Sequence, residues 1–381
     1  MKKEAMNKRR KSVFVLYIAL FFSLFLPLSA PYISLIRNYL RFHLGGYFDL
    51  FLLVFLSIAG AVVSYLLVRG FKRSFRFSLI GLSLMAGALI LSFYFIPDIV
   101  LIEGVHFIEY GVLTLLFIIG LKPDERGIFS IVAAVSLSLL VSLADETVQF
   151  LVSSRVGELR DLLLNFFAVV AGCGLTLVAT SSSFRGKGSS RFLLFISLLI
   201  PILLLSFFLF AFFAERGYVV RGDGYLFRSR FPKERLVLLA KERGRLWLSA
   251  KERFKPRLLG KRRSVWERED YYLTEAQAHT RIRNEFKKKG DFYSAYFEDR
   301  ILMDFYLPYL LATDQSWGRA ERLAIEKKIK LGGTPYRSKA FPHLIVGADW
   351  CFLFFFLIGV IIVVKFLFIW VLPRRLKIIG T

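Results

Sequence analysis

The stretch EGVHFIEYGVLTLL, residues 103–116, joins a polar segment directly to an apolar one. From Val112 onward the chain is as apolar as a bilayer-spanning segment, and this run continues to Ile119. The turns before it carry a histidine, two glutamates and a tyrosine. Each ionisable side chain within a membrane costs ~2.5 kcal/mol or more, so such residues need polar partners and indicate a functional site.

The rest of the chain shows the same apolar character in long blocks. It has 381 residues, of which 56% are hydrophobic, and its mean hydropathy is +0.54. The apolar blocks are roughly 20 residues long, the length of helix that crosses ~30 Å of hydrocarbon. Strands of a transmembrane barrel would instead alternate apolar and polar residues. The predicted fold class is therefore all-α, a polytopic bundle of transmembrane helices.

Eight spans are expected. The first follows a basic N-terminal segment that resembles the start of a signal peptide. We predict that this first helix is retained, because a cleavage site before Pro31 would have Leu28 where a small residue is required. The expected spans are 12–31, 49–68, 77–96, 104–120, 128–150, 161–180, 191–214 and 345–372.

The distribution of Lys and Arg predicts the orientation of these spans. Both termini and the loops at 69–76 and 181–191 are basic, and basic loops are retained in the cytoplasm. The alternation then places residues 215–343 outside the cell. We expect a protein of the bacterial cytoplasmic membrane, divided into an N-terminal tail and first span (1–48), a membrane domain (49–180), a loop and seventh span (181–214), a basic extracytoplasmic domain (215–343), and a last span with its tail (344–381).

The predicted extracytoplasmic domain is long, polar and mainly helical. It holds 30 Lys and Arg against 17 Asp and Glu, a difference of 30 − 17 = +13. Long domains cross the membrane largely regardless of charge, so this excess does not oppose the orientation. The domain opens with two β-type runs around Gly222-Asp223-Gly224, which predict a hairpin. Its basic helices are either simply solvated or bind anionic lipid headgroups or cell-wall polymers.

Polar residues also occur on three consecutive predicted spans, at the end of each that this orientation places outside. They recur at helical spacing, so that each span presents them on one face. A neutral structural network would more easily use Ser, Thr and Asn, whereas this set suits acid–base chemistry or anion binding. Locking the three helices together is the alternative role. The candidate residues are His106, Glu109, Tyr110, Asp145, Glu146, Gln149, Arg155, Asp161 and Asn165.

The order and spacing of these residues resemble the VanZ-like family, which is named for a protein of teicoplanin resistance. The shared pattern is His-x-x-x-Tyr-x-x-Leu, then Glu-x-x-Gln, then Arg, Asp and Asn, and it covers about residues 50–180. Ala168 departs from the glycine usual in the family, and the loop SSRVGELRD lacks the common Pro-Gly-Arg. The resemblance implies a membrane protein of the bacterial envelope, and some members of the family lower susceptibility to teicoplanin-type antibiotics.

Three functions remain open at this stage. In the first, the protein modifies a lipid-linked envelope component at an outward-facing site, with His106, Glu146 and Asp161 as catalytic candidates. Arg155, Gln149, Asn165, Tyr110, Glu109 and Asp145 would then bind the substrate. In the second, the protein is a non-catalytic scaffold that binds anionic lipids or polymers. A transporter is the third, although transporter sites usually lie near the bilayer midplane.

No cofactor, metal or nucleic acid is expected to take part. The four histidines lie on different segments, without a further Cys or His at metal-ligand spacing. The sequence has neither a Walker-type phosphate loop nor a Gly-x-Ser-x-Gly motif. Membrane lipids are the expected partners.

Overall fold

The computed structural model describes residues 2–96, 103–121, 127–151, 157–180, 190–260, 270–329 and 334–366. It is 83% helical, so the prediction of an all-α membrane protein is confirmed. Within the described residues, six helical segments are long and apolar enough to cross a membrane, and two shorter apolar helices accompany them. These helices are α1 (Lys2–Leu44), α2 (Phe48–Arg73), α3 (Phe75–Phe95), α4 (Gly104–Gly120), α6 (Ile128–Leu151), α7 (Leu159–Thr180), α8 (Ser190–Ala214) and α15 (Gly347–Phe366).

Apart from the first, the helices begin and end within a few residues of the expected spans. The end of the last expected span, at residue 372, lies outside the described residues. The first span was expected to end near residue 31, but α1 continues to Leu44 and is followed by the short 3-10 turn η1 (Gly45–Tyr47). The added part reads YISLIRNYLRFHL, where large apolar residues are interleaved with basic ones. Arg41 places its guanidinium 5.0 Å from the ring centroid of Phe48, which opens α2.

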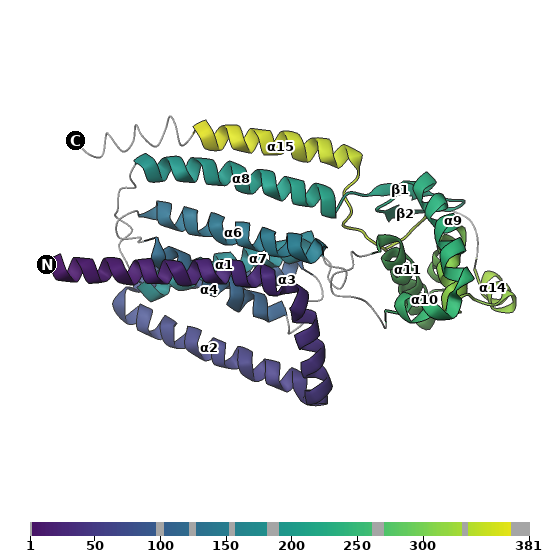
Figure 1. Ribbon diagram of the computed structural model, residues 1–381, viewed down its shortest axis with the longest axis horizontal. Coiled ribbons are helices and arrows are strands. Elements are labelled where there is room, and N and C mark those ends of the chain that lie inside the picture. The colour runs from purple at the N-terminus through teal and green to yellow at the C-terminus, as the bar shows by residue number, and fades with distance from the viewer. Residues whose placement is uncertain are drawn as a thin grey trace. The chain divides into compact units, whose positions relative to one another are not determined.

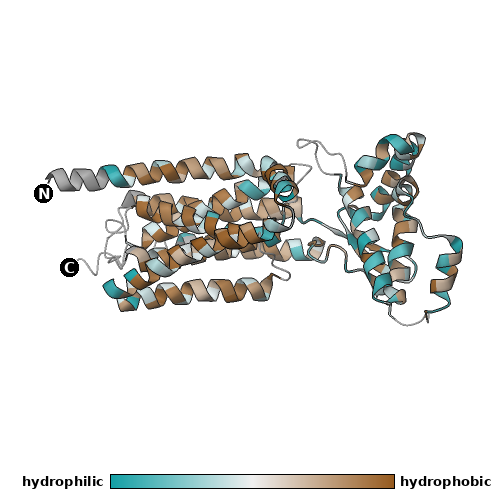
Figure 2. Ribbon diagram, turned by 90° about the horizontal axis from the view of Figure 1, so that it is seen from below, coloured by the Kyte–Doolittle hydropathy of each residue, from teal (hydrophilic) through white to brown (hydrophobic). Residues whose placement is uncertain are grey.

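The chain forms two compact units. The first, here the membrane unit, contains α1 to α7, α8 as far as Phe210, and α15 from Phe354 onward. The second, here the insert unit, contains Ala211–Leu353. Colouring by hydropathy separates the two, because the helices of the membrane unit are largely apolar along their length and those of the insert unit carry many polar residues (Figure 2).

Helix α7 is the centre of the membrane unit and packs against α2, α3, α4 and α6. Glycines make two of these contacts close. A Cβ added to Gly81 of α3 would lie 2.4 Å from the carbonyl oxygen of Gly174, and one added to Gly172 would lie 2.6 Å from that of Gly111 in α4. Small residues let neighbouring transmembrane helices approach closely, so this packing needs glycine at these positions.

Two further helices complete the apolar part. Phe192 and Ile196 of α8 join the same buried cluster as Ala19 of α1 and Phe129 of α6. Helices α8 and α15 run side by side (Figure 1), and the rings of Phe208 and Phe354 lie 5.8 Å apart.

The described residues of the insert unit form a small sheet and six helices. Strands β1 (Tyr218–Arg221) and β2 (Tyr225–Ser229) form the predicted hairpin, with Tyr218 opposite Ser229. Strand β3 (Tyr336–Arg337) adds to β2 in parallel. The helices are α9 (Lys233–Ser249), α10 (Lys251–Leu258), α11 (Tyr271–Lys288), α12 (Phe292–Phe305), α13 (Leu307–Thr313) and α14 (Arg319–Glu326).

An aromatic core holds the insert unit together. Phe227, Tyr272 and Tyr306 are almost fully buried, and they pack with Trp247 of α9 and Phe305 of α12. The helical stretch over 233–254 is interrupted at Ala250, whose φ of −140° and ψ of 49° are not helical. The break lets α10 pack against α13 as α9 does.

Candidate functional site

Three helix ends bring the candidate residues of the membrane unit together. They are the first turns of α4, the last turns of α6 and the first turns of α7, and these three helices pack against one another. We call the following set the polar cluster: His106, Glu109 and Tyr110 from α4, Asp145, Glu146 and Gln149 from α6, and Asp161 and Asn165 from α7. Arg155, the remaining candidate, lies outside the described residues.

Hydrogen bonds join α4 to α6 within the polar cluster. The hydroxyl of Tyr110 donates to Oδ2 of Asp145 at 2.7 Å. Nε2 of Gln149 donates to Oδ2 of Asp145 and to Oε1 of Glu146, each at 3.2 Å. All four side chains are buried. Burying a polar group is costly unless it is hydrogen-bonded, so these contacts lower the cost of placing two carboxylates inside the bundle.

The start of α7 closes the cluster from the other side. The backbone N–H of Glu158, next to the helix, lies 3.4 Å from Oε2 of Glu146. Helix N-termini favour negative charge, because their first N–H groups have no partner within the helix. Gly157 makes the approach possible, since a Cβ there would lie 2.3 Å from the carbonyl oxygen of Glu146.

A more exposed rim surrounds the buried part of the cluster. The side chains of His106, Glu109 and Asp161 are 20%, 28% and 24% exposed. The ring of His106 lies parallel to that of Tyr110, one turn further along α4, with 6.2 Å between centroids. Nδ1 of His106 lies 3.8 Å from a carboxylate oxygen of Glu109. The rim therefore combines a titratable imidazole with carboxylates that incoming polar groups can reach.

Asn165 differs from the other members. Its side chain is fully buried in α7, one turn below Asp161. Neither amide atom has a hydrogen-bond partner among the described residues. A buried amide without partners is costly, and such groups in native proteins often mark a site that a polar ligand or a water completes.

The structure adds a pair that sequence reasoning missed. Both guanidinium NH2 groups of Arg160 bind the carboxylate of Glu103, at 2.7 and 3.0 Å, and thereby tie the start of α7 to that of α4. The same guanidinium lies 3.2 Å from Asp161. Bidentate Arg–carboxylate pairs are geometrically specific and strong for surface-accessible contacts. In the sequence, Arg160 could have been recognised as a candidate because it directly precedes the candidate residue Asp161.

Among the described residues, no three His, Cys, Asp or Glu side chains gather in a way that could hold a metal ion. The chemistry that the cluster itself can supply is proton exchange at an imidazole and carboxylates, together with hydrogen bonding by amide and phenol groups.

The fold and the cluster define a polytopic α-helical membrane protein with a polar site where three of its helices end. Residues 13–180 match the family model described as VanZ/LLP1, and this part of the chain is a VanZ-like membrane domain. The match begins at residue 13 and so includes α1, which packs against α4 and α6. No curated protein matches the chain, and no solved structure does.

Proposed function

We propose that the VanZ-like domain binds an anionic, lipid-linked component of the bacterial envelope at the polar cluster and modifies it by acid–base chemistry. The change would alter susceptibility to teicoplanin-type glycopeptides, as some members of the family do. The observation that carries the proposal is the buried Tyr110–Asp145–Gln149–Glu146 network, with a half-exposed rim around His106. Ionisable groups at membrane depth are functional-site candidates by default.

The proposed roles follow from exposure and hydrogen bonding. His106 exchanges a proton with the substrate, because its ring lies on the rim and its type of side chain titrates near neutral pH. Glu146 is fully buried, bonded to Gln149, and orients the site. Asn165 supplies hydrogen bonds to the bound group, since its buried amide has no partner in the described residues. Arg155 binds the phosphate or carboxylate of the ligand.

The location of the cluster favours envelope chemistry over transport. Its residues lie in the terminal turns of α4, α6 and α7, whereas transporters usually bind substrate near the bilayer midplane. We propose that these ends face the outer side of the cytoplasmic membrane, the side expected from loop charge.

A second candidate function is a non-catalytic interaction protein. The specific observation in its favour is the +13 charge of residues 215–343, from 30 − 17. Such a domain would bind anionic lipid headgroups or cell-wall polymers, and the polar cluster would then serve only to join helices.

Replacing His106 by Gln tests the first proposal, because glutamine keeps hydrogen bonding but does not take up a proton near neutral pH. The chain is expressed in a teicoplanin-susceptible bacterium, and its effect on the inhibitory concentration is measured. We expect His106→Gln to lose this effect at unchanged membrane abundance and melting temperature. His43→Gln is the matched control, since His43 is an exposed residue of α1 outside the cluster.

Full activity of His106→Gln would remove the proposed proton exchange. Combining His106→Gln with Glu146→Gln separates the two candidate functions further. Residues that act as one unit show non-additive losses, so the double variant should be little worse than either single variant. Structural contacts would instead give small losses, because polar contacts between transmembrane helices average ~0.6 kcal/mol.

A further inference from the structure

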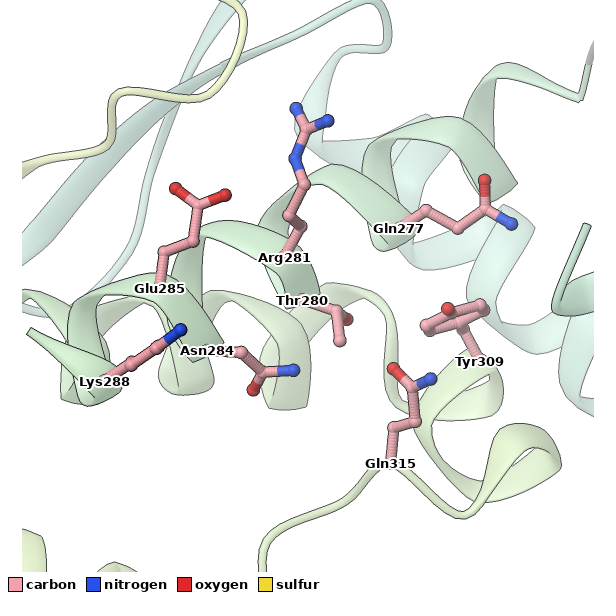
Figure 3. A pocket seen from close by; sticks show the side chains of 8 residues that line it. All are labelled: Gln277, Thr280, Arg281, Asn284, Glu285, Lys288, Tyr309 and Gln315. Carbon is pink, nitrogen blue, oxygen red and sulfur yellow. The ribbon is translucent and has the colours of Figure 1, made fainter. Parts of the chain in front are cut away.

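A second polar site lies in the insert unit, on one face of α11. It is an open cleft with a volume of about 440 Å³, within the ~300–1,000 Å³ typical of small-molecule sites. Six lining residues come from α11 at the spacing of a single helical face, and two come from α13 and the loop after it (Figure 3). They are Gln277, Thr280, Arg281, Asn284, Glu285, Lys288, Tyr309 and Gln315.

Each lining side chain carries a hydrogen-bonding group on an apolar stem. Three of them are amides, from Gln277, Asn284 and Gln315; Nε2 of Gln277 already donates to the carbonyl oxygen of Leu258, and Oδ1 of Asn284 accepts from Arg283. Arg281 and Lys288 are exposed on the rim. Neither makes an ion pair with another side chain in the part of the chain that the structure describes. Their five and three N–H groups therefore remain available to a ligand.

A buried arginine holds the wall of this cleft in place. Arg283 is only 2% exposed. Its guanidinium donates to Asp299 and to the backbone carbonyl of Gln315, both at 2.8 Å, and to the amide oxygen of Asn284 at 3.2 Å. It also lies over the ring of Trp317, 4.7 Å from its centroid. Two of the three amide residues of the cleft are thus positioned by one fully buried charge.

The loop that carries Gln315 is fixed from its other end as well. Asp314, just before it, has a positive φ of 58° and binds the amines of Lys251 and Lys255 in α10. These two ion pairs are solvent-exposed, and exposed pairs contribute little net stability. Together with the buried contacts of Arg283 they hold the loop in one conformation, which lowers the entropy cost of binding.

We propose that the α11 cleft binds a short oligosaccharide that carries an anionic group. The amides match the hydroxyl and acetamido groups of sugars. Arg281 and Lys288, which together outnumber the acidic lining residue Glu285, match a carboxylate or phosphate. Tyr309 is nearly buried, so the recognition is polar rather than by stacking on an open ring. This proposal does not depend on the polar cluster, which belongs to the other unit.

Calorimetric titration of the full chain in detergent micelles tests the cleft with three defined probes. They are a hyaluronan tetrasaccharide, which carries carboxylates, the neutral trisaccharide triacetylchitotriose, and inorganic phosphate. We expect saturable binding of the tetrasaccharide, weaker binding of the neutral sugar, and the weakest binding of phosphate.

Variants identify the residues responsible. Arg281→Ala should weaken tetrasaccharide binding roughly tenfold or more and the neutral sugar little, since a hydrogen bond to a charged group is lost. Gln315→Ala should weaken both sugars several-fold. Arg253→Ala is the matched control, because it removes the same charge from an exposed position of α10 outside the cleft. Its binding should equal that of the unmodified chain.

Three results would overturn the proposal. The first is no saturable binding of either sugar. The second is an equal loss with Arg253→Ala and Arg281→Ala, which would mean attraction by net charge alone. The third is phosphate binding as tight as the tetrasaccharide, which would mean an anion site without sugar recognition.

Discussion

Tyr110 of α4 donates a 2.7 Å hydrogen bond to Asp145 of α6, and both side chains are buried in the bundle. The bond connects the helix that bears His106 to the helix that bears Glu146. This hydrogen bond therefore links the exposed rim of the polar cluster to its buried part.

Tyr110→Phe removes this hydrogen bond and keeps the ring. We expect the variant to lose most of the effect on teicoplanin susceptibility that we propose for this chain, because the Asp145 carboxylate then lacks its donor from α4. The loss of stability should stay within ~0.6–1.7 kcal/mol, the range of interhelical polar contacts in membranes. Thermal unfolding in detergent and the inhibitory concentration measure the two effects separately.

Tyr94→Phe is the control for this change. Tyr94 lies on α3 and is 79% exposed, so its hydroxyl contributes nothing to the cluster. A Tyr110→Phe variant with the same susceptibility as Tyr94→Phe would show that the α4–α6 hydrogen bond has no functional role.

Much of the membrane unit follows from local patterns in the sequence. Apolar runs of span length predict the helices, and helical spacing predicts that Asp145 and Gln149 share a face, which the hydrogen bond between them agrees with. Long-range partners do not follow from spacing. Arg160 and Glu103 are 57 residues apart, and only the packing of α7 against α4 brings them together.

Neither the length of α1 nor the cleft of the insert unit could be predicted from local sequence patterns. Residues 32–44 lack a pure span pattern, and their helix is visible only in the folded chain. The cleft depends on Arg283, which reads as a surface residue in a basic stretch but is buried between Asp299 and Trp317. Burial of a charge is decided by tertiary contacts, and hydropathy predicts the opposite.

Close helix packing gives a prediction with an internal control on α3. Gly81→Ala would place a Cβ 2.4 Å from the carbonyl oxygen of Gly174, whereas Gly87→Ala meets nothing within 4 Å. We expect Gly81→Ala to destabilise the membrane unit by ~1–3 kcal/mol, as overpacking does. Gly87→Ala should be neutral or slightly stabilising, because alanine favours helix by ~1 kcal/mol over glycine.

Melting temperatures of the two detergent-solubilised variants check this expectation. Equal melting temperatures would mean that α3 and α7 accommodate the added methyl group of Gly81→Ala without a loss of stability. The close approach at Gly81 and Gly174 would then not hold the two helices together.

A pH dependence is expected where the insert unit begins and ends. Partial desolvation, together with the guanidinium charges of Arg230 and Arg228, lowers the pKa of His343 from 6.5 to about 4, although the side chain remains 40% exposed. This shift persists although a carboxylate oxygen of Glu215 lies 3.2 Å from Nε2. Between pH 6.5 and about 4, the His343 side chain is therefore protonated in the unfolded chain but not in the folded chain. Stability should therefore fall as the pH is lowered from about 6.5 to 4.

Urea unfolding of the full chain at several pH values measures this effect. Tryptophan emission reports chiefly on the insert unit, which contains Trp247, Trp266, Trp317 and Trp350 out of five tryptophans. His343→Gln should flatten the pH dependence in this window. An unchanged slope in His343→Gln would assign the dependence to other groups.

The orientation of the chain is the last prediction, and the proposed site depends on it. Loop charge places residue 74, between α2 and α3, in the cytoplasm and the insert unit outside. Single cysteines at Ser74 and Ser249 test this in a chain carrying Cys173→Ala and Cys351→Ser, because the native Cys351 is exposed. On intact cells, an impermeant maleimide should label Ser249→Cys alone, and Ser74→Cys only after permeabilisation. The alternation of spans expected from loop charge predicts that the helix ends carrying the polar cluster face the outer side of the membrane. Labelling at position 74 but not 249 would therefore turn the cluster toward the cytoplasm and remove its access to outward-facing envelope components.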